Sequence, residues 1–149
     1  MLRLILTAGL ALATASVSAA GVDLPADAQA AIRAAARDYA EGWYTGDRER
    51  MARSLHETLA KRAWLPDGEG GRRFDAIDKA GLVASTTPAH RERYANAPKR
   101  AEVEILDGFG HVATVKLRMD GWVDYMHLAE VPGEGWKIVN VLWELEPKR

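Results

Sequence analysis

The chain has 149 residues, no cysteine, and a formal net charge of −1 from 20 basic and 21 acidic residues. Such a balance is not typical of proteins that bind nucleic acids or anionic membranes, because both classes rely on a basic excess. The lack of cysteine excludes disulfide bonds, so the fold must depend on its hydrophobic core.

The N-terminus has the pattern of a secretory signal peptide. Arg3 provides a positive start, residues 4–13 are apolar, and small residues lead to a cleavage site after Ala19 or Ala20. The apolar run is shorter than the roughly 20 residues that a membrane-spanning helix needs. We therefore expect residues 1–20 to be removed and a single domain over residues 21–149 to be periplasmic or secreted, without membrane association.

Two helices are predicted at the start of this domain. Apolar residues recur at helical spacing from Ala28 to Trp43, and Gly46 followed by Asp47 suits the end of one helix and the N-cap of the next. Steps of four between Met51, Leu55 and Leu59 predict that the second helix includes all three residues.

The middle of the chain is expected to be less regular. A short strand is predicted over residues 61–66, a glycine-rich turn over 67–71 and a third short helix around 74–83. Residues 86–100 are polar, contain two prolines and are expected to form a connector.

The last third of the chain predicts four antiparallel strands joined by three turns. The strands are expected over residues 101–105, 112–119, 122–131 and 136–145, with turns at 107–110, 120–121 and 132–135. Helices followed by strands indicate an α+β fold, in which N-terminal helices pack on a curved antiparallel sheet.

This order of elements resembles the nuclear transport factor 2-like superfamily, also known as the cystatin-like or cone-shaped α+β fold. Two stretches resemble, more specifically, the family described as Putative lumazine-binding. They are Tyr39 to Arg62, which includes Trp43-Tyr44-Thr45-Gly46-Asp47 and Leu55-His56, and Val123 to Leu128 together with Gly135 to Trp143. The resemblance implies a cone-shaped pocket, but the superfamily contains isomerases, dehydratases and non-catalytic binding domains, so it does not assign a reaction.

Histidine residues are the first candidates for a functional site. The four histidines lack metal-binding spacings, so we predict neither a metal site nor a cofactor. His56, expected at the end of the second helix near Trp43 and Tyr44, can act as an acid, a base or a hydrogen-bond donor at a pocket mouth. The helix dipole alone also explains a histidine at such a position.

Strand parity gives the second set of candidates. If residues 132–135 form a four-residue loop, His127 lies opposite Asn140 on the face that also carries Tyr125, while Asp124 points to the other face. The predicted pocket wall contains Trp43, Tyr44, His56, Tyr125, His127 and Asn140. If the Asp124 face is concave instead, Asp124 becomes a buried carboxylate suited to proton abstraction, so Asp124 and His127 are the alternative catalytic candidates.

Aromatic residues and the last strand suggest what the domain binds. Seven aromatic side chains can form either a ligand cavity or ordinary core: Trp43, Tyr44, Trp64, Trp122, Tyr125, Trp136 and Trp143. The last strand is apolar on both faces, which predicts a homodimer through the sheet. The sequence therefore favours an exported domain that binds a small hydrophobic or aromatic ligand. A cofactor-independent lyase or isomerase, and a protein-interaction domain that uses its sheet, remain the alternatives.

Overall fold

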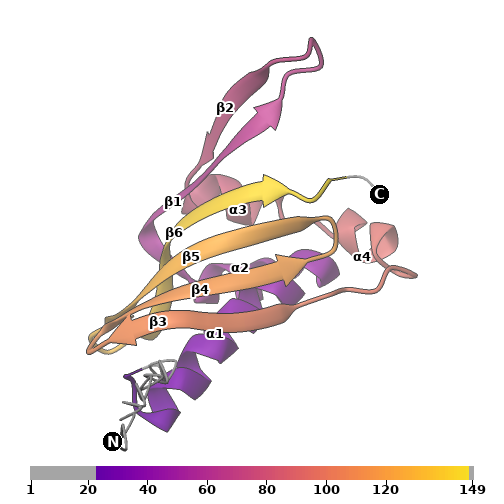
Figure 1. The fold of residues 1–149 in the computed structure, drawn as a ribbon. Coiled ribbons are helices and arrows are strands. Elements are labelled where there is room, and N and C mark those ends of the chain that lie inside the picture. The colour runs from indigo at the N-terminus through magenta and orange to yellow at the C-terminus, as the bar shows by residue number, and fades with distance from the viewer. Residues whose placement is uncertain (1–22, 148–149) are drawn as a thin grey trace, which may run out of the picture.

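The computed structural model describes residues 23–147, so the predicted signal peptide lies outside the described residues. Four helices and six strands follow one another in this part of the chain (Figure 1). The elements are α1 (Ala26–Thr45), α2 (Arg48–Ser54), β1 (Leu55–Pro66), β2 (Arg72–Ile77), α3 (Lys79–Ser85), α4 (Ala89–Arg93), β3 (Glu102–Phe109), β4 (Val112–Met119), β5 (Trp122–Val131) and β6 (Gly135–Leu145).

A single curved, open sheet forms one layer and the helices form the other (Figure 1). The strand order is β2-β1-β6-β5-β4-β3, and β1 pairs with β6 in parallel while all other neighbours are antiparallel. The predicted α+β class and the four-strand meander are confirmed. The parallel β1–β6 pair makes the sheet mixed, which the sequence did not indicate.

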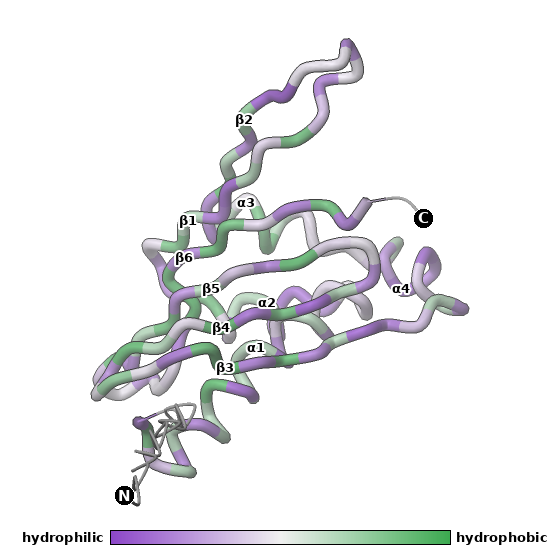
Figure 2. The backbone as a smooth tube through the Cα atoms, in the orientation of Figure 1, coloured by the Kyte–Doolittle hydropathy of each residue, from purple (hydrophilic) through white to green (hydrophobic). Residues whose placement is uncertain are grey.

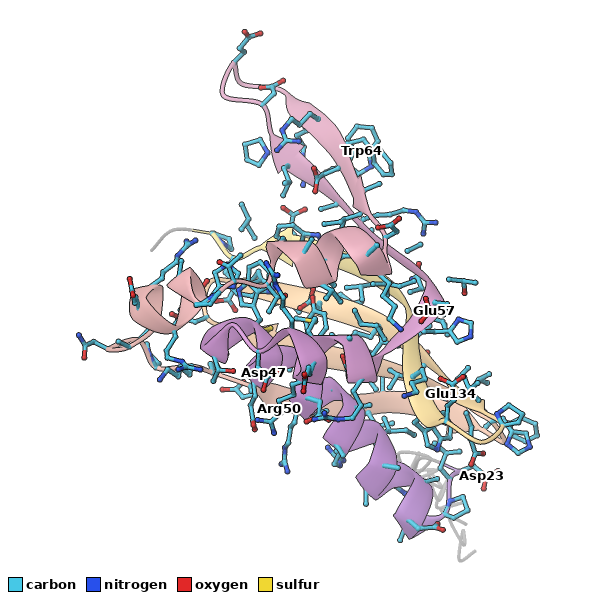
Figure 3. The ribbon with its side chains drawn as sticks, turned by 180° about the vertical axis from the view of Figure 1, so that it is seen from behind. Asp23, Asp47, Arg50, Glu57, Trp64 and Glu134 are labelled. Atoms are coloured by element: carbon cyan, nitrogen blue, oxygen red, sulfur yellow. The ribbon has the colours of Figure 1, made fainter. Side chains whose placement is uncertain are left out.

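The junction between α1 and α2 follows the sequence closely (Figure 3). Gly46 adopts a left-handed conformation with φ of 67°, and the Asp47 side chain accepts a hydrogen bond from the Arg50 backbone nitrogen at 2.9 Å. A Cβ on Gly46 would lie 2.1 Å from the Thr87 carbonyl oxygen, so glycine is required both by its conformation and by this contact. The junction therefore also sets where the segment after α3 runs.

The second helix is shorter than the sequence predicted. It ends at Ser54, and Leu55 begins β1 by pairing with Ile138 of β6. Residues four apart share a face in a helix and also in a strand, because four is close to 3.6 and a multiple of two. The spacing of Leu55 and Leu59 therefore fits both structures, and the pairing with β6 decides between them.

Residues 72–100 also differ from expectation. Residues 72–77 form β2, although a helix was predicted from about residue 74. The helix α3 begins only after Asp78, which caps it by accepting a hydrogen bond from the Gly81 nitrogen at 2.8 Å. The predicted connector contains the short helix α4. Strands β1 and β2 form a hairpin that projects beyond the rest of the sheet, and we call residues 64–74 the arm (Figure 1).

The hairpin between β5 and β6 contains two departures from regular pairing that cancel. Val131 pairs with Gly135, so the connection has three residues and not the four predicted. A register shift then occurs between His127 and Leu128, which pair with Asn140 and Ile138 and leave Val139 as the extra residue of a β-bulge. His127 therefore does pair with Asn140 as predicted, although Ala129 pairs with Lys137 and not with Ile138, the partner that a four-residue loop would give it.

The core lies between the helices and the concave face of the sheet. Ile32 of α1 meets this face, where Leu117, Met126 and Ile138 are fully buried. Each such side chain contributes about 1.5–3 kcal/mol when removed from water. The strands alternate between hydrophobic and hydrophilic residues (Figure 2), so the convex face is the more exposed one.

Candidate functional site

A cavity of 210 Å³ opens at one end of this core, where α1, α3 and α4 meet the ends of β1, β5 and β6. Its wall is almost entirely apolar and aromatic. The lining residues are Tyr39, Trp43, Lys61, Leu82, Arg93, Tyr94, Trp122, Trp143 and Leu145. Three of the five tryptophans of the chain therefore face one small space.

An ion pair between Lys61 and Asp124 lies at the inner end of the cavity. The Lys61 Nζ atom is 2.6 Å from Asp124 Oδ1, and the two side chains are 9% and 0% exposed. The second carboxylate oxygen, Oδ2, accepts a hydrogen bond from Trp122 Nε1 at 3.0 Å. Both oxygens of this buried carboxylate therefore have a partner, as buried charges require.

Strand register explains why these two residues meet. Lys61 lies beside Val141 of β6, and Asp124 lies opposite Trp143 of the same strand, so both point to the concave face. The Lys61 ammonium also lies 4.7 Å from the centre of the Trp143 ring and 5.6 Å from that of Tyr39. Aromatic faces attract a desolvated cation, which helps to hold Lys61 in place.

Burial changes the protonation properties of this end of the cavity. Burial lowers the pKa of Lys61, while the Asp124 carboxylate opposes that change by favouring the charged ammonium. Burial raises the pKa of Tyr39 well above its usual value, and the negative charge of Asp124 raises it further. The Tyr39 phenol is therefore neutral throughout the physiological range, and the cavity wall carries no negative charge from it.

The other end of the cavity is bounded by α4 and the residue that follows it. Trp43 Nε1 donates a long hydrogen bond of 3.4 Å to the Tyr94 hydroxyl, and the His90 ring lies 4.1 Å from the Trp43 ring. Burial lowers the pKa of His90, so the neutral imidazole is favoured against the indole. Arg93, on the last turn of α4, places its guanidinium 5.4 Å from the centre of the Tyr94 ring.

The residues predicted from the helical hairpin are placed differently from one another. Trp43 lines the cavity, whereas Tyr44 is buried behind it and bonds to two backbone groups, Arg100 O at 2.7 Å and Asp120 N at 2.8 Å. His56 lies at the start of β1, not at a helix end, and hydrogen-bonds to Thr58 at 2.8 Å. His56 is not part of the cavity wall.

The three residues predicted from the sheet lie on the convex face, away from the cavity. Asn140 bridges them to β1: its amide nitrogen is 3.3 Å from His127 Nδ1, and its oxygen accepts a hydrogen bond from Arg62 at 2.9 Å. Tyr125 is 47% exposed on the same face. The predicted single wall is therefore not formed, because the face that carries Asp124 is the concave one.

Sequence reasoning missed Lys61 and Arg93 as cavity residues, and it did not choose Trp122 and Trp143 over the other aromatic residues. Lys61 occupies an inward position between Leu59 and Ala63, which are both buried. In β1 a lysine takes the place of an apolar residue at one of the inward positions, and in β5 an aspartate does the same. Two opposite charges at inward positions of two strands are a sequence signal for a buried ion pair. No comparable signal existed for Arg93, because it lies in a segment predicted to be a connector.

Among residues 23–147, no cluster of three or more histidine, aspartate or glutamate side chains is suited to hold a metal ion. Within the same range, no helix is long and apolar enough to span a membrane.

The fold is the cystatin-like fold that nuclear transport factor 2-like proteins share. A protein of this kind and of unknown function from Shewanella baltica has a TM-score of 0.63 at 18% identity over 82% of this chain and 96% of its own. Another, from Novosphingobium aromaticivorans, gives 0.57 at 17% identity over 83% and 84% of the two chains. A ketosteroid isomerase-like protein from Erwinia carotovora gives 0.52 at 14% identity over 80% and 96%.

The family described as Putative lumazine-binding matches residues 27–144, and the chain belongs to this family. No curated protein matches the chain. The solved structures share the fold at low identity, so they support the architecture and not a particular ligand.

Proposed function

We propose that this protein is an exported ligand-binding domain whose cavity holds a small planar aromatic molecule. The observation that supports the proposal is the convergence of Trp43, Trp122 and Trp143 on one cavity of 210 Å³. Ligand sites are mostly apolar with a few fixed polar groups, and aromatic walls favour stacked or edge-on contacts with an aromatic ligand. Membership of the Putative lumazine-binding family supports the same class of function.

The Lys61 ammonium supplies the fixed polar group. An ammonium has three hydrogen-bond donors, and Asp124 accepts only one of them. The remaining donors are available to a carbonyl oxygen or ring nitrogen of the ligand. Because Asp124 holds the ammonium in one position, the ligand is oriented without the entropy loss of ordering a free lysine side chain.

Two features favour binding over lyase or isomerase chemistry. Asp124 does not line the cavity, and both of its oxygens are occupied by Lys61 and Trp122. A general base must come within hydrogen-bond distance of the proton that it removes. The other candidate, His127, lies on the convex face and has no access to the cavity.

The test is isothermal titration calorimetry with 2-naphthamide, a neutral two-ring aromatic probe. We expect binding to the wild type and a loss of about 10- to 100-fold in affinity for Trp43→Ala, because burial of a large side chain contributes about 1.5–3 kcal/mol. His56→Ala is the matched control and should bind as the wild type does. Equal affinities for wild type and Trp43→Ala would contradict the proposal.

The convex face supports a further part of the proposal, a homodimer through the sheet. Leu142 and Tyr125 are 56% and 47% exposed at its centre. Trp64, labelled in Figure 3, pairs with Phe74 across the arm, and the two are 53% and 52% exposed. Residues of both charge signs, among them Arg62 and Glu144, lie on the same face, so a second copy related by a two-fold axis can bring opposite charges together. A second copy of the chain is the occupant that we propose.

A further inference from the structure

The side chains that line the cavity carry positive charge and no negative charge. This excess of positive charge indicates what kind of ligand the cavity can bind. The titratable residues on the wall are Tyr39, Lys61, Arg93 and Tyr94, and no acidic side chain is among them. The Lys61 charge is balanced by Asp124 at 2.6 Å. Burial raises the pKa of Tyr39, which keeps its phenol neutral, so the unbalanced charge of the wall is that of Arg93.

Arg93 has no carboxylate partner within residues 23–147. Its guanidinium is instead held near the Tyr94 ring, at 5.4 Å from the ring centre. The wall thus has an unpaired, permanently charged group at the α4 end and a neutralised ion pair at the inner end. A guanidinium presents its N–H groups as a planar fork, which matches the two oxygens of a carboxylate.

We infer that the ligand is an aromatic carboxylate of one or two rings, with its ring among the tryptophans and its carboxylate at Arg93. This inference rests on the proposed binding function and adds the charge and size of the ligand. The cavity of 210 Å³ is smaller than the roughly 300–1,000 Å³ of typical sites for drug-sized ligands, which limits the ring system to one or two rings. An anion at Arg93 also gives the wall a balanced charge.

The experiment compares 2-naphthoate with 2-naphthamide, which has almost the same shape but no charge, by calorimetric titration at pH 7. We expect the wild type to bind 2-naphthoate at least about 10-fold more tightly, because a charge-assisted hydrogen bond is roughly twice as strong as a neutral one. In Arg93→Met the ratio of the two affinities should fall to about 1, while binding of 2-naphthamide stays close to the wild-type value.

Arg91→Met is the matched control, because Arg91 is an exposed arginine of the same helix that does not line the cavity. It should retain the wild-type preference for 2-naphthoate. Equal binding of both probes by the wild type would overturn the charge inference and leave the binding function intact. A preference that persists in Arg93→Met would overturn the role of Arg93, and failure of both probes to bind would overturn the binding function itself.

Discussion

Removing the charge of Asp124 while keeping its shape, as in Asp124→Asn, is the most direct test of the ion pair. The substitution leaves the Lys61 ammonium, with a side chain only 9% exposed, without a compensating anion. Breaking a buried pair in this way costs about 3–5 kcal/mol. The loss of unfolding free energy at pH 7 has an upper limit, because Lys61 can lose its proton and become neutral rather than remain a buried, unpaired cation. For an ordinary lysine pKa of 10.5, deprotonation at pH 7 costs about 5 kcal/mol at roughly 1.4 kcal/mol per unit.

This limit gives the prediction a definite pH dependence. In Asp124→Asn the carboxylate no longer opposes the effect of burial, so the pKa of folded Lys61 lies lower than in the wild type and the unfolded variant binds more protons than the folded one over a wider pH range. Stability of the variant should therefore rise with pH toward 10.5, and the difference from wild type should shrink to about 1 kcal/mol near pH 10. Urea unfolding followed by tryptophan fluorescence at several pH values measures both quantities.

A double variant separates the missing attraction from general damage to the core. Lys61→Met alone should also cost about 3–5 kcal/mol, because it leaves the Asp124 carboxylate buried without a cation. Adding Asp124→Asn should then recover most of that loss, since the double variant contains no buried charge and the asparagine can still accept the Trp122 hydrogen bond. A cost below about 1 kcal/mol for Asp124→Asn at pH 7, or a cost independent of pH, would refute the reasoning.

Two further predictions follow from other parts of the structure, and a third follows from the N-terminal sequence. Tyr44→Phe should cost about 1–3 kcal/mol at neutral pH, because it leaves the Arg100 carbonyl and the Asp120 amide unpaired. Burial raises the pKa of Tyr44 to about 12. The extra free energy of unfolding of the wild type should therefore be fully present below pH 10 and be lost as the pH rises through 12. Urea unfolding of both proteins at several pH values measures this difference. Leu142→Glu should shift sedimentation from two subunits to one, whereas Ala31→Glu on the exposed side of α1 should not; a wild type that is monomeric at micromolar concentration would contradict the dimer. The intact mass of the exported protein should lack the first 19 or 20 residues, and a full-length mature form would exclude cleavage.

The sequence predicted the fold well at positions where a residue pattern is compatible with only one local structure. The αL glycine Gly46, the N-cap Asp47 and the turn at Asp120-Gly121 each allow few alternatives. At these points α1 and β4 end, and α2 and β5 begin, as expected. The end of α2 was wrong because the spacing of Leu55 and Leu59 suits a helix and a strand alike. Only the long-range pairing of β1 with β6 selects the strand.

The site was harder to predict because its residues are distant in the sequence. The opposite orientations of Asp124 and His127 were predicted correctly from parity, and the structure places Asp124 on the concave face. Which face is concave depends on where the helices pack, and the alternation of a single strand contains no information about that. Lys61 and Asp124 are 63 positions apart, so their contact requires the register of three strands.

The bulge at Val139 also affects how residues are compared between relatives. Beyond it, Val141 and Trp143 point to the cavity side and Asn140 and Leu142 point outward. At 18% identity, an alignment that omits this extra residue, or adds one that a relative lacks, shifts every later residue of β6 by one position and exchanges the two sets. A cavity tryptophan in one protein would then be matched to a surface residue in another, and a shared ligand site would be missed. Alignments of this region should therefore be anchored on the paired Cα atoms of β5 and β6 before any residue is compared.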